Sequence, residues 1–350
     1  MVERRYFCRL QDQREVWLYR IINTWGEYIE LLDYGATLYS LCVRDRSGAL
    51  KDVVLGPAVP SELETCPYMG SVIGRCANRI AYGHFYLNGA ECHLEQNQNG
   101  HHLHGASGNY ARQLFELWEI QENRLRFHLE DTGKGGFDNR AQVFVEYGFD
   151  DQGRLEICYE ITPEEDTILS PTSHAYFNLT GDDVRSHMLW IPSVRAAKKG
   201  RSGMPEGEVW DVRGSAWDFT TPRMIGEALS AGHDGEFAKQ PRRFDDCYLL
   251  ENGRSMAAQL YAPQTGIRLR VFTDMPSLIL FTPVAAQAVR GKRGAVYDGY
   301  CAVCLETQYV PNAINCKSFK QPVFRAGEAL RSRTVYEFSV VQAQLQEEVI

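Results

Sequence analysis

Four short polar clusters in this 350-residue sequence contain residue types that move protons or bind polar ligands. They are GRCANRI at 74–80, HHLHG at 101–105, SHAYFNL at 173–179 and CLETQYVPNAIN at 304–315. Imidazole and carboxylate side chains exchange protons, and arginine and asparagine donate hydrogen bonds to oxygen-rich ligands. Together the clusters predict a pocket for a polar small molecule, equipped with an acid and a base.

Taken singly, His174 and Glu306 also have structural interpretations. A histidine among aromatic residues is commonly a satisfied, partly buried side chain, and a glutamate in a strand commonly faces water. Strand alternation, however, places Glu306 on one face with Cys304 and Gln308, neither of which is a typical solvated neighbour. At this level both the catalytic and the structural interpretations stay open.

Two motifs contain residue types that bind metal ions. In HHLHG, alternation puts His102 and His104 on one face of a strand and turns His101 away. Cys301 and Cys304 form a C-x-x-C pair, but no second pair follows at zinc spacing. Because neither motif has the complete ligand set of a zinc site, we expect no bound metal.

The elements that position these clusters are predicted to be strands. Apolar residues alternate with polar ones in most readable segments, most clearly at 125–129, 143–149, 155–161 and 267–271. The intervening turn sequences are DRSG at 45–48, LNGA at 87–90, FDDQG at 149–153 and ENGR at 251–254. Only SELET at 61–65 favours a short helical turn. We expect an all-β fold, a single large antiparallel β-sandwich over residues 1–350.

Composition removes several classes of function. The net charge is −8 and no basic block occurs, which argues against a nucleic-acid or anionic-membrane partner. No apolar run is long enough to span a membrane, and the charged start lacks the apolar stretch of a signal peptide. Ten cysteines in 350 residues are too few for a disulfide scaffold, so reduced thiols and a cytoplasmic location are expected. Dinucleotide, P-loop and nucleophile-elbow motifs are not found.

From about residue 25 onward, the motifs of this sequence and their order resemble those of the aldose 1-epimerase (galactose mutarotase) family. The motifs that carry the resemblance are DYGATLYSLCVRDRSGALKDVVLG at 33–56, GRCANRIAYGHFYLNG at 74–89, LHG at 103–105, TSHAYFNLTG at 172–181, MPEGEVWDVRGSAWDF at 204–219 and LETQYVPNAIN at 305–315. A single motif would be weak, whereas six in the family's order are specific.

The resemblance implies a galactose mutarotase-like supersandwich that interconverts the α and β anomers of a free aldose such as glucose or galactose. The family's general acid is the histidine of H-x-Y-F-N-L, here His174, and its general base is the glutamate of L-E-x-Q, here Glu306. The implied sugar contacts are Asn78, Arg79, His104 and Asp245. No cofactor is implied, the partner is a sugar, and the chain would be a monomer or a homodimer.

The implied chemistry suits these residue types. Anomer exchange needs the C1 hydroxyl deprotonated while the ring oxygen is protonated, so one carboxylate and one imidazole suffice. With unshifted pKa values, the carboxylate and the imidazolium coexist between roughly pH 4.3 and 6.5. A bell-shaped pH profile is therefore expected, with Glu306 on its acid limb.

Several positions depart from the family pattern. Ile279 and Phe281 stand where a sugar-contacting glutamine and a tyrosine are usual, and Phe115 and Asn312 replace a tryptophan and an aspartate. Asp246 follows Asp245 where a histidine is usual. We therefore expect an altered substrate preference. Two alternatives stay open: a non-catalytic carbohydrate-binding protein of the same fold, and an epimerase of a phosphorylated hexose, for which AAKKGR at 196–201 is the candidate cationic segment.

Overall fold

Strands dominate the computed structural model, which describes residues 2–58, 62–64, 68–200, 203–231, 243–251 and 256–342. Among these residues the one α-helix is α1 (Ile225–Ser230). Each of the multi-stranded sheets is antiparallel, so the predicted all-β fold is confirmed. In the described part of the chain, every helix falls short of the length and apolarity that a bilayer crossing requires.

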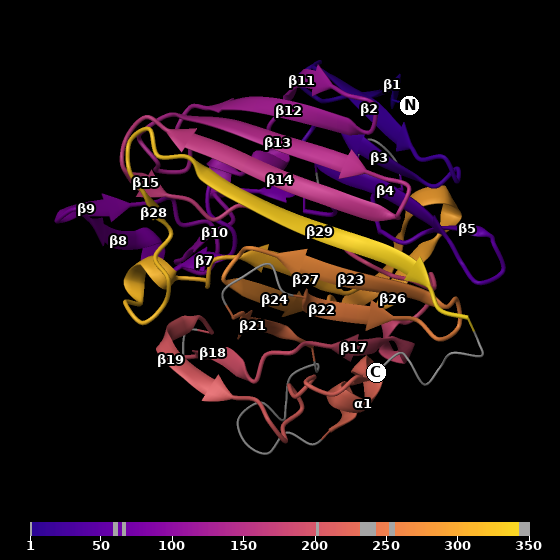
Figure 1. Ribbon diagram of the computed structural model, residues 1–350. Coiled ribbons are helices and arrows are strands. Elements are labelled where there is room, and N and C mark those ends of the chain that lie inside the picture. The colour runs from indigo at the N-terminus through magenta and orange to yellow at the C-terminus, as the bar shows by residue number, and fades with distance from the viewer. Residues whose placement is uncertain are drawn as a thin grey trace.

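A nine-stranded sheet extends along one side of the molecule (Figure 1). In spatial order its strands are β11 (Glu116–Ile120), β12 (Arg124–Asp131), β13 (Ala141–Phe149), β14 (Arg154–Pro163), β29 (Leu330–Val340), β23 (Ile267–Thr273), β22 (Met256–Tyr261), β17 (Met188–Trp190) and β20 (Arg223–Met224).

The alternation seen in the sequence is the reason that these segments form strands. In β13, Val143, Val145 and Tyr147 are buried, whereas the residues between them are partly exposed. The same alternation holds in β14 and β23. A strand that buries every second residue needs a second layer against that face. Leu129 of β12 is partly exposed, so the predicted pattern weakens at that strand end.

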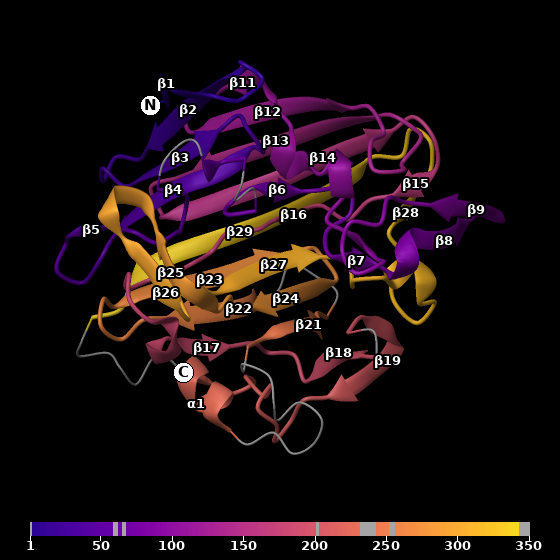
Figure 2. The ribbon, with the colours of Figure 1, turned by 180° about the vertical axis from the view of Figure 1, so that it is seen from behind.

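Two five-stranded sheets form the second layer (Figure 2). The first contains β1 (Val2–Arg9), β2 (Glu15–Ile22), β3 (Tyr28–Leu32), β4 (Thr37–Arg44) and β5 (Leu50–Asp52). The second contains, in spatial order, β19 (Pro205–Asp211), β18 (Arg195–Lys199), β21 (Asp245–Leu249), β24 (Ser277–Phe281) and β27 (Cys304–Gln308). The main apolar core draws residues from all three sheets, Leu31, Val145 and Leu305 among them.

Short strand pairs and 3-10 turns connect the layers and carry most of the polar clusters. The pairs are β6 (Val72–Ile73) with β16 (Thr172–Ser173), β7 (Arg79–Ile80) with β10 (His102–Leu103), β8 (His84–Leu87) with β9 (Ala90–His93), β15 (Thr167–Ile168) with β28 (Val323–Phe324), and β25 (Ala285–Arg290) with β26 (Val296–Gly299). The 3-10 turns are η2 (Ala81–Gly83), η3 (Ala106–Gly108), η4 (Tyr110–Arg112), η5 (Val184–Ser186), η7 (Lys292–Gly294) and η8 (Ala313–Asn315).

The predicted turns mostly lie where expected. DRSG joins β4 to β5, and FDDQG joins β13 to β14. In LNGA, Asn88 and Gly89 have φ angles of 50° and 81°, as a two-residue hairpin between β8 and β9 requires. Residues 252–254 of ENGR, and 61 and 65 of SELET, lie outside the described residues, while 62–64 form a turn. Helix α1 was not predicted, because six residues are too few to display a helical period.

Candidate active site

Glu306 lies in the middle of β27, at the edge of its five-stranded sheet. The strand register pairs Glu306 with Ile279 of β24, and Cys304 with Phe281. Phe281 in turn pairs with Asp245 of β21. Because side chains two residues apart in a strand share a face, all five point to the same side of this sheet. One face therefore combines two carboxyl groups, a thiol and two apolar side chains.

His174 follows directly after β16, and backbone contacts hold it against β27. Its N–H donates to the carbonyl of Ser71 at 2.9 Å. Three residues further on, Phe177 and Val303 exchange two backbone hydrogen bonds of 2.8 Å, so the chain after His174 pairs with the residue before β27. As a result, Nε2 of His174 lies 3.6 Å from Oε1 of Glu306.

Aromatic rings enclose the imidazole of His174. The ring of Tyr176 is nearly parallel to it at a centroid distance of 5.0 Å, and that of Tyr68 is nearly parallel at 6.2 Å. Phe281 meets it edge-on at 6.1 Å. The sequence interpretation did not single out Tyr68 or Tyr176 as site residues. Tyr176 could have been found, because in an extended chain residues two apart point to the same side, as His174 and Tyr176 do; Tyr68 carried no such signal.

Three further predicted residues are brought together beside this pair. The rings of His104 and His174 are 5.6 Å apart. Asn78 and His104 exchange two hydrogen bonds: the Asn78 N–H donates to Nδ1 of His104 at 3.1 Å, and the His104 N–H donates to the Asn78 carbonyl at 3.0 Å. Arg79 is next along the chain, and its Nε donates to Oε1 of Gln98 at 2.7 Å.

Because Nδ1 of His104 accepts a hydrogen bond, the proton of the neutral ring lies on Nε2. Burial lowers the pKa of His104 well below its ordinary value, and the nearby His174 and Arg79 act in the same direction. His104 is therefore a neutral hydrogen-bond donor through Nε2.

Exposure increases outward from His174 and Glu306. Glu306 and His174 are 2% and 5% exposed, whereas Asn78, Arg79 and Asp245 are partly exposed. Burial lowers the pKa of His174 to about 4. Burial also raises the pKa of Glu306 well above its ordinary value, and the charge of Asp245 adds to this rise. A buried position thus disfavours the charged form of each group.

Some of the buried polar atoms that lack a protein partner lie at the same place. Among the described residues they include Nδ1 of His174, Oε2 of Glu306 and Oε1 of Gln308. Buried polar groups are normally hydrogen-bonded, so each of these atoms is suited to meet a polar ligand or water.

The two adjacent aspartates are directed differently. Oδ2 of Asp246 accepts the indole N–H of Trp217 at 2.8 Å, and its Oδ1 lies 3.4 Å from Nζ of Lys199. Alternation therefore leaves Asp245 on the Glu306 face and turns Asp246 away from it.

The histidines of HHLHG are each engaged separately. Nδ1 of His101 accepts the N–H of Tyr82 at 3.0 Å, and Nδ1 of His102 lies 2.8 Å from the carbonyl of Glu95. With Nδ1 of His104 accepting from Asn78, the three rings serve three different backbone partners. In the described chain these histidines do not converge on one point where an ion could bind.

One set of potential metal ligands does lie in the site. Nε2 or Nδ1 of His174, Sγ of Cys304 and a carboxylate oxygen of Glu306 lie within 4.8 Å of one another. Burial raises the pKa of the Cys304 thiol well above its ordinary value, so the thiolate needed for metal binding is costly to form. An ion there would also occupy the predicted acid and the predicted base.

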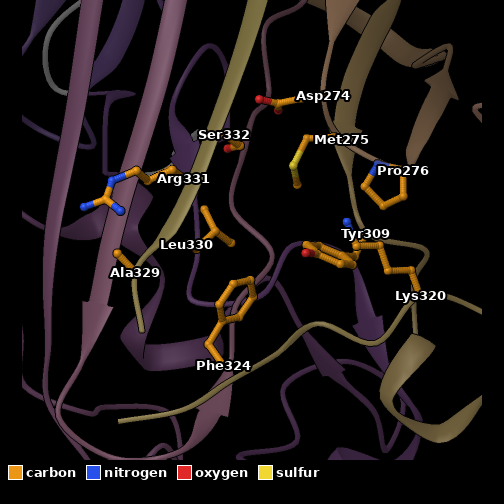
Figure 3. A pocket seen from close by; sticks show the side chains of 10 residues that line it. All are labelled: Asp274, Met275, Pro276, Tyr309, Lys320, Phe324, Ala329, Leu330, Arg331 and Ser332. Carbon is orange, nitrogen blue, oxygen red and sulfur yellow. The ribbon is translucent and has the colours of Figure 1, made fainter. Parts of the chain in front are cut away.

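A cavity of about 280 Å³ lies elsewhere, beyond the end of β27 (Figure 3). Its lining comprises Asp274, Met275, Pro276, Tyr309, Lys320, Phe324, Ala329, Leu330, Arg331 and Ser332. The carboxylate of Asp274 accepts a hydrogen bond from the backbone N–H of Arg333 at 2.9 Å, so it already has a protein partner. None of the six predicted site residues lines this cavity, so it is separate from the predicted site.

Most of the chain is similar to proteins of one known family. The family model described as aldose 1-epimerase matches residues 18–337. Human galactose mutarotase is 32% identical over 320 residues, which is 89% of this chain and 91% of that protein. Aldose 1-epimerase from Escherichia coli K12 is 27% identical over 332 residues, covering 91% and 95% of the two chains.

Solved structures show the same fold. A crystal structure of an aldose epimerase homologue from C. elegans superposes with a TM-score of 0.85 at 25% identity, covering 97% of this chain and 100% of that one. Galactose 1-epimerase from Lactobacillus acidophilus gives a TM-score of 0.84 at 22% identity, covering 98% and 99%. The chain belongs to the aldose 1-epimerase family.

Proposed function

We propose that His174 and Glu306 interconvert the α and β anomers of a free aldose in this chain. Membership of the family makes the protein a carbohydrate isomerase. The observation that carries the residue assignment is the 3.6 Å separation of the two side chains at the buried end of a polar site. In a pyranose, the C1 hydroxyl oxygen and the ring oxygen are bonded to the same carbon. An acid and a base a few ångströms apart can therefore reach both oxygens.

In the forward direction Glu306 removes the proton of the C1 hydroxyl while His174 protonates the ring oxygen. The bond from C1 to the ring oxygen breaks, and the free aldehyde forms. C1 then turns about its bond to C2, and the ring oxygen attacks the other face of the aldehyde. As the ring closes, His174 takes back the proton that it gave to the ring oxygen, and Glu306 returns its proton to the C1 oxygen, so the reaction needs neither a redox step nor a net proton.

Asn78, Arg79, His104 and Asp245 are proposed to hold the sugar hydroxyls. His104 supports this role because its Nε2 carries a proton while Nδ1 is occupied by the Asn78 N–H. Asp245 supports it as a partly exposed acceptor on the Glu306 face. Donors and acceptors around the rim thus complement a ligand whose hydroxyls do both.

The test is polarimetry on freshly dissolved α-glucose and α-galactose with purified protein. Wild type should speed the approach to the equilibrium rotation, and His174→Asn and Glu306→Gln should lose nearly all of that acceleration. A folded wild-type chain that binds these sugars without accelerating mutarotation would mean that it is a binding protein only.

A phosphorylated hexose is not favoured, because the lysines of AAKKGR already have acidic partners. Nζ of Lys198 donates to Glu208 at 2.6 Å, and Nζ of Lys199 lies beside Asp246. Arg201 lies outside the described residues. The retained acid and base likewise argue against a binding-only protein.

We also propose a cytoplasmic location and a monomer or homodimer. Nine described cysteines are free thiols, which fits a reducing compartment. Cell fractionation tests the location, and light scattering on the purified protein tests the oligomeric state.

A further inference from the structure

Two histidines and a glutamate meet on the hairpin formed by β8 and β9, which projects from the side of the molecule (Figures 1 and 2). His84 and His93 are direct cross-strand partners in this hairpin, and Glu91 is the partner of Tyr86. Alternation places all four side chains on the outer face. His84 and Glu91 are 33% and 51% exposed, and His93 is 69% exposed.

Both imidazoles are directed at one carboxylate oxygen. Nε2 of His84 lies 2.8 Å from Oε1 of Glu91, and Nε2 of His93 lies 3.4 Å from the same atom. The two imidazole rings are 5.2 Å apart. One ligand atom from each of the three residues lies within 4.8 Å of the other two. A His–Glu ion pair explains one histidine here; it gives no reason for the second imidazole to converge on the same oxygen.

These separations approach those of a tetrahedral zinc site. With bonds of about 2.0–2.1 Å to nitrogen or oxygen, neighbouring ligand atoms around zinc lie roughly 3.3 Å apart. The 2.8 and 3.4 Å separations bracket this value, and the two imidazole nitrogens lie within 4.8 Å of each other, so an ion would draw the three ligand atoms together. Imidazole nitrogen favours zinc and its transition-metal neighbours, whereas magnesium and calcium favour all-oxygen sites.

The backbone below the three ligands is well anchored. On the opposite face of the hairpin, Phe85 is buried in an apolar cluster with Leu94 and Phe137. The carbonyl of His84 accepts Nδ2 of Asn315 at 2.9 Å, which ties the hairpin to η8. The ligands are therefore presented on an ordered support, and little ordering is left to be done when an ion binds.

We propose that His84, Glu91 and His93 form a surface binding site for a divalent transition-metal ion, with zinc as the preferred ion. Three protein ligands leave the fourth position to water. The site is separate from His174 and Glu306, so occupancy stabilises the hairpin and leaves sugar turnover unchanged.

Zinc alone is the probe, titrated calorimetrically into the metal-free chain. The Cys304→Ala background removes the thiol of the buried ligand set, so that the two sites are not confused. His84→Asn and His93→Asn should each weaken zinc binding at least about tenfold, because even the outer partners of metal ligands are worth 10–100-fold. The control is His128→Asn, which removes another strand histidine beside a glutamate, Glu116. Among the described residues His128 belongs to no set of three potential metal ligands, so its replacement should change nothing.

Thermal unfolding gives a second readout that does not depend on activity. Zinc should raise the Tm of the background chain and of His128→Asn, and it should leave the Tm of the two hairpin variants unchanged. If the hairpin variants bind zinc as tightly as their parent, or if binding is seen only with Cys304 present, the proposal is wrong and the three side chains form a surface ion pair only.

Discussion

His174 and Glu306 face each other across 3.6 Å in a buried site, where neither is favoured in its charged form. A neutral imidazole with a protonated carboxyl contains the same number of protons as an imidazolium with a carboxylate. The two groups titrate as a pair, and the one-proton pair includes the form that Glu306 as base and His174 as acid require. In the proposed reaction, substrate hydroxyls and the ring oxygen decide where that proton resides.

The first prediction concerns the acid. His174→Asn should fold normally and retain less than about a tenth of wild-type turnover, because a positioned acid is worth roughly 10²–10⁴ in rate. Polarimetry on α-galactose measures the loss, and circular dichroism checks the fold. His128→Asn, on the outer face of the nine-stranded sheet, is the control that should keep full activity. Substantial turnover by His174→Asn would assign the acid to another residue.

The second prediction concerns the pH profile. The lowered pKa of His174 puts the acid limb of kcat/KM near about pH 4, where the pair gains a second proton. The raised pKa of Glu306 puts the alkaline limb well above the ordinary range of a carboxyl group. This reverses the assignment made from unshifted values, in which Glu306 set the acid limb.

Asp245→Asn provides the check on that profile. The charge of Asp245 helps to raise the pKa of Glu306, so its removal should move the alkaline limb to lower pH and leave the acid limb in place. An alkaline limb that does not move would show that a group other than Glu306 titrates there.

The third prediction concerns His187, a buried residue outside the site. Its Nε2 accepts the N–H of Leu179 at 3.0 Å, and burial lowers its pKa to about 4. The unfolded chain protonates this residue near its ordinary value of about 6.5. Its contribution to stability is therefore present above pH 6.5 and is lost as the pH falls toward 4, by roughly 3 kcal/mol in all.

Denaturant unfolding between pH 7 and 4 tests this as a difference between wild type and His187→Gln. A difference is needed because the buried carboxyls of Asp33 and Glu306 have raised pKa values and act in the opposite direction. The variant should lack part of the wild-type loss on acidification. Parallel pH curves would contradict the assignment. One cooperative transition in the same experiment is the result expected of a single domain over residues 1–350.

The fourth prediction is that chelators leave turnover unchanged. The proposed steps are proton transfers, and the metal site inferred on β8 and β9 does not touch His174 or Glu306. Dialysis against EDTA followed by polarimetry measures this. Activity that is lost and then restored by zinc would mean that an ion works through His174, Cys304 and Glu306, and Cys304→Ala would then abolish the restoration.

The fifth prediction concerns Ile279, the cross-strand partner of Glu306. Its side chain is buried on the Glu306 face, where it offers no hydrogen bond. A sugar hydroxyl that faces it without a partner costs roughly 1–3 kcal/mol. Ile279→Gln should therefore change the ranking of kcat/KM among hexoses, 6-deoxy sugars and pentoses, whereas Ile279→Leu should not. An unchanged ranking with glutamine would show that Ile279 does not face the sugar.

The sequence by itself was sufficient for the fold class and for the family. Alternation of apolar and polar residues marked β13, β14 and β23, because one face of each of these strands is buried. The motifs around His174 and Glu306 could be recognised because they match those of the aldose 1-epimerase family in type and order. The hairpin turn at Asn88 and Gly89 could also be predicted from the sequence, because Asn-Gly favours the positive φ angles that both residues adopt.

Other features depend on contacts between segments far apart in the chain. The backbone hydrogen bonds between Phe177 and Val303 bring His174 close to Glu306. No local sequence pattern predicts that these two segments pair. Burial then shifts both pKa values, because desolvation depends on everything packed around a group. Asn312, where the family has an aspartate, proves to be structural: its side chain accepts the N–H of Ala81 and donates to the carbonyl of Pro205. These partners are distant in sequence, so only the tertiary structure determines what such residues do.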